Sequence, residues 1–304
     1  MTRQNHILSL VFAVVVLVAV LVSGVEDSAP KDIAQTNPYT QTNTELVAAI
    51  LPPPIILVNF APQPQIASAG ALMSDLSFSK DIFSLNLDQR WPLASLTKLI
   101  TATVALEGLG GDYQITISES AVATEGLAGN FYIGEKFSVS DLVKAMMVTS
   151  SNDAATALAE SFPGGRLAFV EAMSTKVAEL HMTGTSLFGP SGLSLANQST
   201  TPDIRKLVLY IYRFHPEIFK WSTQRTISIT DTISGRKKTL NNINHFAGRS
   251  DFIGGKTGYL DESSGNLVSL FSSKGHIILI IVLGADDRFG ETEKLWKYYK
   301  SLEF

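Results

Sequence analysis

The chain has 304 residues, 45% of them hydrophobic and 17% charged, with a formal net charge of −4 and a pI near 5.8. This is the composition of a globular protein, and the lack of a basic surplus or of runs of like charge argues against nucleic-acid binding. The sequence contains no cysteine, which excludes thiol nucleophiles, thiolate zinc sites, disulfides and lipid attachment at a cysteine. We therefore expect a serine to carry any covalent chemistry.

An uncharged apolar run, residues 7–23, follows Arg3 and precedes Glu26 and Asp27. These flanking charges predict that residues 1–6 lie in the cytoplasm and that the remainder is exported. The length of the run fits either a single membrane anchor or a signal peptide that is cleaved behind it. Residues 24–64 are polar and then rich in proline, which predicts a flexible tether between this segment and a folded domain, 65–304.

The folded domain begins with two strand patterns, 67–75 and 82–86, and continues with a helical pattern that ends at the glycines of 108–111. Further helical patterns occupy the centre of the chain, at 140–148, 153–160 and 164–180 and from Thr201 onward. Strand patterns then return before a closing helix at 291–302; they lie at 226–230, 251–257, 267–272 and 277–283. This order predicts an α+β fold in which the two terminal segments form one antiparallel sheet of about five strands, flanked by helices, with a helical subdomain inserted between them.

The first candidate motif is Ser95-Leu96-Thr97-Lys98, at the start of the first helical pattern. Residues three apart share one face of a helix, so the amine of Lys98 can reach the hydroxyl of Ser95. The amides at a helix start also favour developing negative charge. The same S-x-x-K spacing occurs at 77–80 and 234–237, but both lie in hairpin-like contexts and are interpreted as turn residues.

Two later motifs complete the pattern. Ser150-Ser151-Asn152 falls in the turn between two predicted helices, where short polar side chains can face a cleft. Lys256-Thr257-Gly258 follows Gly254-Gly255, so the strand edge is bare of bulky side chains and a ligand backbone could pair along it. In this order, the motifs supply the parts of a serine acyl-transfer site that has no histidine base.

With the flanking residues 92–98, 147–155, 188–193 and 256–259, the chain resembles the D-alanyl-D-alanine carboxypeptidases, which are low-molecular-mass penicillin-binding proteins. The resemblance covers about residues 65–304 and implies a fold like that of β-lactamases and transpeptidases. The family usually has Asn where Gly189 stands, a departure that concerns a loop. The implied residues are Ser95 as nucleophile, Lys98 as base, Ser150 as proton relay, Asn152 as the holder of Lys98 and of the substrate amide, and Lys256, Thr257, Gly258, Tyr259 and Arg288 for substrate binding.

In this scheme the oxyanion lies between the backbone N–H groups of Ser95 and Tyr259, and Lys256 and Thr257 bind the substrate carboxylate with help from Arg288. Lys98 must be neutral to act as a base, and we expect burial and the positive field of Lys256 to lower its pKa. An alternative for Arg288 is a surface side chain that pairs with Asp286 or Asp287. The five histidines show no metal-ligand spacing, so neither a metal nor a cofactor is expected.

The resemblance implies removal of the terminal D-alanine from peptidoglycan stem peptides at the outer face of the bacterial cytoplasmic membrane or in the wall, and covalent inhibition by β-lactam antibiotics. A D,D-endopeptidase that cuts cross-links on the same fold remains an alternative. A class A β-lactamase would need a glutamate base some 35 residues past the second motif, but 183–191 contains no acid. A non-catalytic wall-binding domain would form no covalent adduct with penicillin.

Overall fold

The computed structural model describes residues 62–126 and 129–302. The predicted segments 1–6 and 7–23, and nearly all of the tether 24–64, lie outside the described residues. Within the described ranges, no helix is both long enough and apolar enough to cross a membrane.

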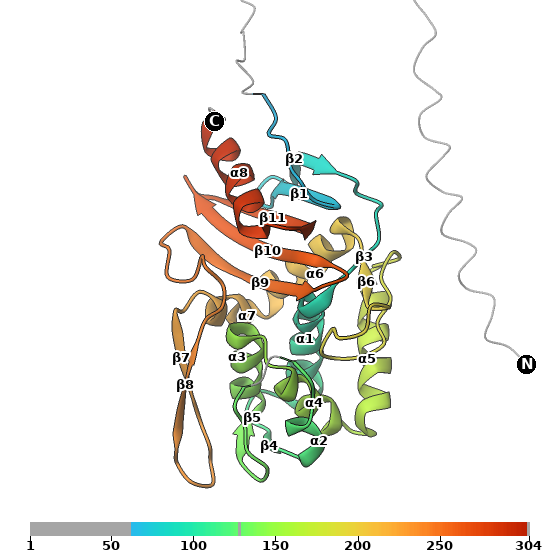
Figure 1. Cartoon of the computed structure of the whole chain (residues 1–304), viewed down its shortest axis with the longest axis vertical. Coiled ribbons are helices and arrows are strands. Elements are labelled where there is room, and N and C mark those ends of the chain that lie inside the picture. The colour runs from blue at the N-terminus through green and yellow to red at the C-terminus, as the bar shows by residue number, and fades with distance from the viewer. Residues whose placement is uncertain (1–61, 127–128, 303–304) are drawn as a thin grey trace, which may run out of the picture. The chain divides into compact units, whose positions relative to one another are not determined.

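The central element is a five-stranded antiparallel sheet in the order β2-β1-β11-β10-β9 (Figure 1). Its N-terminal strands are β1 (Gly70–Asp75) and β2 (Lys80–Leu85). Its C-terminal strands are β9 (Phe252–Leu260), β10 (Ser264–Ser273) and β11 (His276–Ala285). Because β1 pairs with β11, segments about 200 residues apart form one sheet, and the predicted α+β architecture is confirmed.

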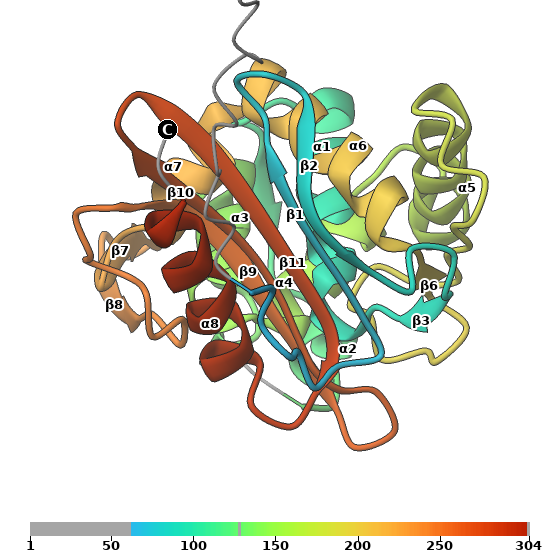
Figure 2. The ribbon, with the colours of Figure 1, turned by 90° about the horizontal axis from the view of Figure 1, so that it is seen from above.

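Both faces of the sheet are covered, so its inner strands β1, β10 and β11 are buried along most of their length. Side chains alternate along β11 between two buried clusters, one containing Ile278, Ile280 and Val282 and the other Leu279, Ile281 and Leu283. Figure 2 shows α8 (Arg288–Ser301) on one side of the sheet and most of the other helices behind it. On the α8 side, Trp296 stacks on Phe271 with ring centroids 4.6 Å apart.

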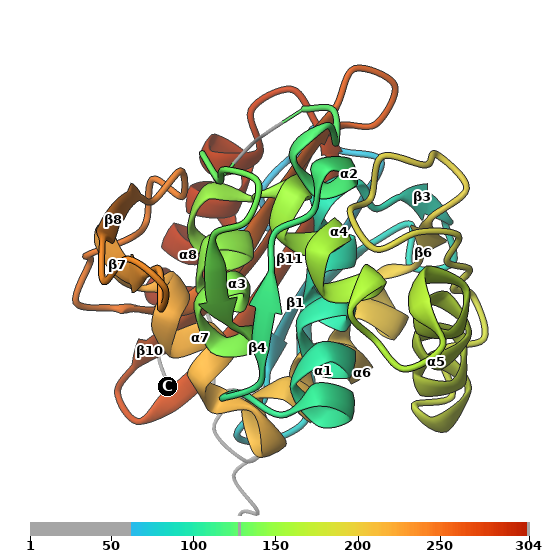
Figure 3. The same cartoon turned by 90° about the horizontal axis from the view of Figure 1, so that it is seen from below.

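The helices between the two groups of strands form the other layer. They are η1 (Ala94–Thr97), α1 (Lys98–Leu109), α2 (Glu119–Val122), α3 (Val139–Thr149), α4 (Asn152–Glu160), α5 (Gly165–Glu179), α6 (Thr201–Phe214) and α7 (Pro216–Ser222). Figure 3 shows α1, α3 and α4 close together on this side, where they pack against one another. The helix predicted from Thr201 onward is confirmed with Pro202 in its first turn, but the capping side chain is that of Thr200, one residue before the threonine expected to cap it.

Three two-stranded ladders lie outside the main sheet. They are β3 (Trp91–Pro92) with β6 (Gln198–Ser199), β4 (Gln114–Thr116) with β5 (Lys136–Ser138), and β7 (Thr226–Thr230) with β8 (Lys237–Asn241). The two additional S-x-x-K matches fall at the β1–β2 and β7–β8 turns, as predicted. Neither of these serines therefore has its lysine on a shared helical face.

Candidate active site

Ser95 lies in η1, a short 3₁₀ helix, and α1 begins only at Lys98. The sequence predicts Ser95 at the start of a regular helix, whereas the structure has a short 3₁₀ turn there. Because η1 continues directly into α1, the two side chains still share a face, and Nζ of Lys98 lies 2.9 Å from Oγ of Ser95. Ala94, just before the serine, has φ 46°, in the left-handed region that residues other than glycine rarely adopt. Ser95, the predicted nucleophile, thus lies on a sharp, strained turn.

The amine of Lys98 is fully buried and has three oxygen neighbours. It lies 2.6 Å from Oδ1 of Asn152 and 2.5 Å from the carbonyl oxygen of Ser191, besides the Ser95 hydroxyl. A carbonyl oxygen can only accept, so Asn152 and Ser191 take two N–H groups of the amine. The third position faces Ser95. In the neutral amine that position holds the lone pair, which can accept the Ser95 proton.

Burial lowers the pKa of Lys98 to about 7, because the charged amine loses its hydration there. The nearby carboxylate of Asp153 opposes this and raises the pKa. The sequence analysis also invoked the charge of Lys256, but the lowering at Lys98 comes from burial. The repulsion instead acts on Lys256, where burial and then the charges of Lys98 and Arg288 hold the pKa well below its usual value.

Ser150 and Asn152 flank the junction between α3 and α4. Ser150 ends α3 in a left-handed conformation, with φ 61°, and Ser151 caps α4 by accepting from the amide of Ala154. Asn152 is therefore the first residue of α4. Its Nδ2 donates to the carbonyl of Glu125 at 2.8 Å, which fixes the side-chain amide so that Oδ1 faces Lys98.

Lys256 and Thr257 lie on β9, the edge strand of the sheet next to η1. The predicted strand edge is confirmed by the sheet order. Nζ of Lys256 donates to Oγ of Ser150 at 2.8 Å and to the carbonyl of Thr257 at 2.7 Å. The second and third motifs therefore meet directly, although they are 106 residues apart.

Two glycines let the backbone of neighbouring segments approach η1. A Cβ on Gly258 of β9 would lie 2.9 Å from the carbonyl oxygen of Leu93. A Cβ on Gly192 would lie 1.9 Å from the carbonyl oxygen of Ala94, and Gly192 also has φ 85°. Both positions exclude larger residues on steric grounds. Gly258, the glycine of the third motif, thus allows close packing against the turn that carries Ser95 and also keeps the edge of β9 free of a side chain.

A cavity of about 290 Å³ joins the three motifs. From the predicted set it is lined by Ser95, Ser150, Asn152, Thr257, Gly258, Tyr259 and Arg288. Lys98 and Lys256 lie behind this lining, fully buried, and contact it through their amines.

Arg288 belongs to the wall of this cavity. Its Nη1 donates to the carbonyl of Gly258 at 3.0 Å, so the side chain turns toward β9. The alternative, a surface arginine paired with Asp286 or Asp287, is therefore wrong. Tyr259 is 59% exposed, and its ring lies 6.0 Å from the guanidinium of Arg288. Gly189, the departure from the family pattern, has open space around it and does not line the cavity.

The cavity has further lining residues to which the sequence analysis gave no role. They are Gly126, Ser191, Gly192, Leu193, Ile243 and Leu260. Ser191 and Gly192 belong to the quoted segment 188–193, which marked their region without revealing that a carbonyl there would bind Lys98. Gly126 and Ile243 lie in connections with no motif of their own, so only the folded chain shows where they are.

Comparisons with known proteins agree with this fold. Residues 58–287 match the family model described as peptidase S11, D-alanyl-D-alanine carboxypeptidase. A D-alanyl-D-alanine endopeptidase of Pseudomonas aeruginosa is 31% identical over 249 residues, 79% of this chain and 79% of that protein.

Two solved structures are also similar. The D-alanyl-D-alanine carboxypeptidase DacD of Francisella tularensis is 27% identical with a TM-score of 0.71, over 79% of this chain and 71% of that one. Penicillin-binding protein D2 of Listeria monocytogenes, in its cefotaxime-bound form, is 27% identical with a TM-score of 0.68, over 78% and 99%. With three quarters of its length matched by the family model, the chain belongs to the peptidase S11 family of D-alanyl-D-alanine carboxypeptidases, which are serine peptidases.

Proposed function

We propose that this protein is a serine D-alanyl-D-alanine carboxypeptidase that removes the terminal D-alanine of peptidoglycan stem peptides. The observation that carries the proposal is the hydrogen bonding of the Lys98 amine. Two carbonyl oxygens accept its N–H groups, and the remaining position faces Ser95. A buried amine with a pKa near 7 is a suitable general base at neutral pH. Membership of the family supports the same substrate class.

In the proposed acylation step, Oγ of Ser95 attacks the carbonyl carbon between the two D-alanines while its proton passes to Nζ of Lys98. The oxyanion that forms is stabilised by the backbone N–H groups of Ser95 and Tyr259, beside the positive end of the η1–α1 turn. Ser150 then relays to the leaving amine the proton that Lys98 has taken, so both side chains regain their starting protonation. The hydrogen bond that Lys256 donates to Ser150 orients the hydroxyl for this step. Water hydrolyses the resulting ester by the reverse sequence.

The leaving D-alanine carries a carboxylate, for which Lys256, Thr257 and Arg288 form the binding end of the cavity. Without substrate, burial and two neighbouring cations lower the pKa of Lys256. A bound carboxylate would raise that pKa again and favour the charged amine. Occupation of the site and protonation of Lys256 are therefore coupled, so a substrate with a free carboxylate is preferred over one without.

A D,D-endopeptidase is the second candidate, because the 31% identical Pseudomonas protein carries that name. Both activities use the same acyl-enzyme and differ in the leaving group. Analysis of purified muropeptides by mass spectrometry separates them, because free D-alanine indicates the carboxypeptidase and monomers released from cross-linked dimers indicate the endopeptidase. Dimers that disappear while pentapeptides persist would reject the first proposal in favour of the second.

Covalent binding of β-lactams is part of the proposal, and the cefotaxime-bound form of the Listeria relative supports it. Intact-mass measurement after incubation with penicillin should show one adduct, and Ser95→Ala should show none. An adduct on Ser95→Ala would overturn the assignment of the nucleophile. Because the substrate lies outside the cytoplasmic membrane, we also propose an exported location there, with the membrane or the wall as the site of action.

A further inference from the structure

Asp153 follows the second motif directly and is almost completely buried, at 2% exposure. Its two carboxylate oxygens lie 2.9 and 2.8 Å from the backbone amide nitrogen of Gly129, and Oδ1 also accepts from the amide of Ala154. The hydroxyl of Ser151 donates to the same Oδ1. None of these partners is a cation, so the carboxylate is held by neutral donors within the fold. Such an arrangement is expensive to bury and suggests a task beyond capping α4.

The amide that Asp153 binds belongs to the segment that orients Asn152. Glu125, four residues before Gly129, accepts the hydrogen bond from Nδ2 of Asn152. Gly126 is packed against the same amide group, since a Cβ there would lie 2.7 Å from Nδ2. Glu125 and Gly129, on either side of residues 127–128, therefore each contact one of two adjacent residues of α4.

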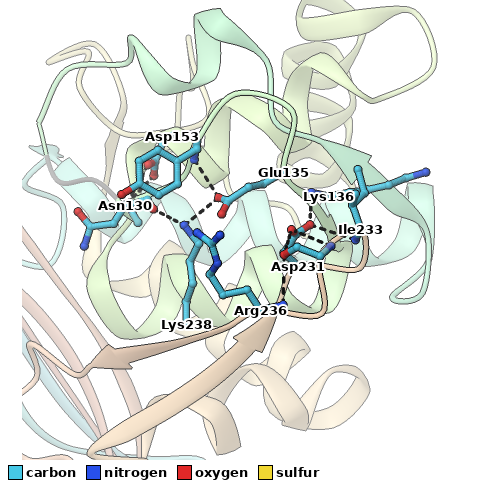
Figure 4. A network of polar contacts seen from close by, with 11 residues as sticks. Asn130, Glu135, Lys136, Asp153, Asp231, Ile233, Arg236 and Lys238 are labelled. Carbon is cyan, nitrogen blue, oxygen red and sulfur yellow. Dashed lines mark hydrogen bonds and ion pairs between the residues drawn. The ribbon is translucent and has the colours of Figure 1, made fainter.

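The far end of this segment is anchored separately, by Lys238 of β8 (Figure 4). Its amine pairs with Glu135 at 2.8 Å, donates to the carbonyl of Asn130 and lies 4.6 Å from the ring centroid of Tyr132. In the same view, Asp231 accepts from the amide of Lys136 at the start of β5. The β7–β8 hairpin thus fixes the outer residues 130–136, and Asp153 is the contact that fixes the inner residue, Gly129.

We propose that Asp153 is a positioning residue for acylation: by binding Ser151, Ala154 and Gly129 it fixes the first turn of α4, from which Asn152 contacts Lys98. This inference rests on the proposed function of Ser95 and Lys98. Its second effect is electrostatic. Asp153 on α4 is the charge that raises the pKa of Lys98 against the effect of burial, whereas the charges of Lys98 and Arg288 act on Lys256 of β9. Removal of the Asp153 charge therefore favours the neutral amine of Lys98 at lower pH.

The test is the rate of acylation by a fluorescent penicillin, measured from pH 5.5 to 9 on the whole protein and on Asp153→Asn. The substitution keeps the shape of the side chain but replaces an acceptor oxygen by a donor and removes the charge. The expected result is a plateau rate about 10- to 100-fold lower, as for a misoriented catalytic group, and a midpoint displaced to lower pH. An unchanged plateau and midpoint would overturn the proposal.

Asp203→Asn is the matched control, because Asp203 is also a buried acid in the first turn of a helix and accepts from a loop amide, that of Gly184, at 2.7 Å. It lies on α6 and does not line the cavity. We expect Asp203→Asn to lower the melting temperature but to keep the midpoint and the rate per folded molecule. If the midpoint of the pH profile moved equally in both variants, the shift would reflect a general loss of stability and would contradict the role of Asp153.

A second measurement needs no variant. Hydrogen exchange at the Gly129 amide should be as slow as in the first turn of α4, because a buried carboxylate accepts its hydrogen. Exchange at the rate of an exposed loop would overturn the proposal even if Asp153→Asn failed to fold. Failure of the proposed function is a separate outcome, since the unmodified protein would then form no adduct with the fluorescent penicillin.

Discussion

The carbonyl oxygen of Ser191 lies 2.5 Å from Nζ of Lys98 and accepts one of its hydrogens. Ser191 comes from the loop between α5 and β6, whereas Asn152, the other carbonyl partner of the amine, comes from α4. The proposed base, Lys98, is therefore oriented by two elements that are separate from the η1–α1 turn that carries Ser95. This arrangement leads to predictions about pH, stability and packing.

The first prediction concerns the pH dependence of acylation. Because burial lowers the pKa of Lys98 to about 7 and only the neutral amine can accept a proton, the acylation rate should rise with pH to a plateau, with a midpoint near 7. Stopped-flow measurement with a fluorescent penicillin over pH 5.5 to 9 checks this. Lys98→Met should lose several orders of magnitude at every pH. A rate that stays constant across this range would contradict the role of Lys98.

The second prediction concerns stability. The folded pKa of Lys98, about 7, is below the unfolded value of 10.5, so the unfolded state binds more protons between these limits. The free energy of unfolding therefore rises with pH in that window, by up to about 1.4 kcal/mol per pH unit. Urea denaturation at pH 7, 8 and 9 should show the unmodified protein gaining stability relative to Lys98→Met. A constant difference between the two proteins would show that the amine stays charged when buried.

The third prediction concerns Gly192. Alanine at this position would place a Cβ 1.9 Å from the carbonyl oxygen of Ala94 and would be strained at φ 85°. We expect Gly192→Ala to lower the free energy of unfolding by about 2 kcal/mol or more and to slow acylation, because the serine turn must shift. The matched control is Gly189→Ala, since Gly189 has open space around it. Equal stability of the two variants in thermal denaturation would contradict the proposed packing constraint.

The fourth prediction concerns Lys256. Its replacement in Lys256→Met removes the cation at the proposed carboxylate end but also the hydrogen bond to Ser150. We therefore compare two substrates that differ only in a free or an amidated terminal carboxylate. The kcat/KM for the free acid should fall more than that for the amide, by about 10-fold or more as for a lost charge-assisted contact. Equal losses of kcat/KM for the two substrates would show that Lys256 only orients Ser150 and does not bind the carboxylate.

The sequence predicts the sheet well because β11 is one long apolar run and the turns between strands are marked by glycine and polar residues. The continuous run of β11 and the turn at Lys274-Gly275 place β10 and β11 within a few residues of their observed ends. Pairing of β1 with β11 follows from the general rule that terminal strands join one sheet when helices separate them. The 3₁₀ geometry of η1 was missed, since i and i+3 spacing is compatible with both kinds of helix.

The site is predictable where one short motif supplies both the side chain and its context. Ser95 and Lys98 share a turn, and the S-x-x-K decoys are rejected by local context alone. The contacts made by backbone groups could not be predicted this way, because the carbonyls of Ser191 and Glu125 are chosen by loop conformation and not by residue type. The effect of Asp153 on Lys98 likewise depends on how the turn before α4 folds.

The contact between β9 and η1 is made at the backbone, where Gly258 faces the carbonyl of Leu93. The interface between the sheet and the helical layer therefore passes through the candidate active site, with Ser95 on the helical side and Lys256 on the sheet side. A molecule that is bonded to Ser95 and also contacts β9 links the two layers. Inhibitors that make both contacts should consequently reduce the relative motion of the two layers, while inhibitors that only acylate Ser95 should leave that motion unchanged.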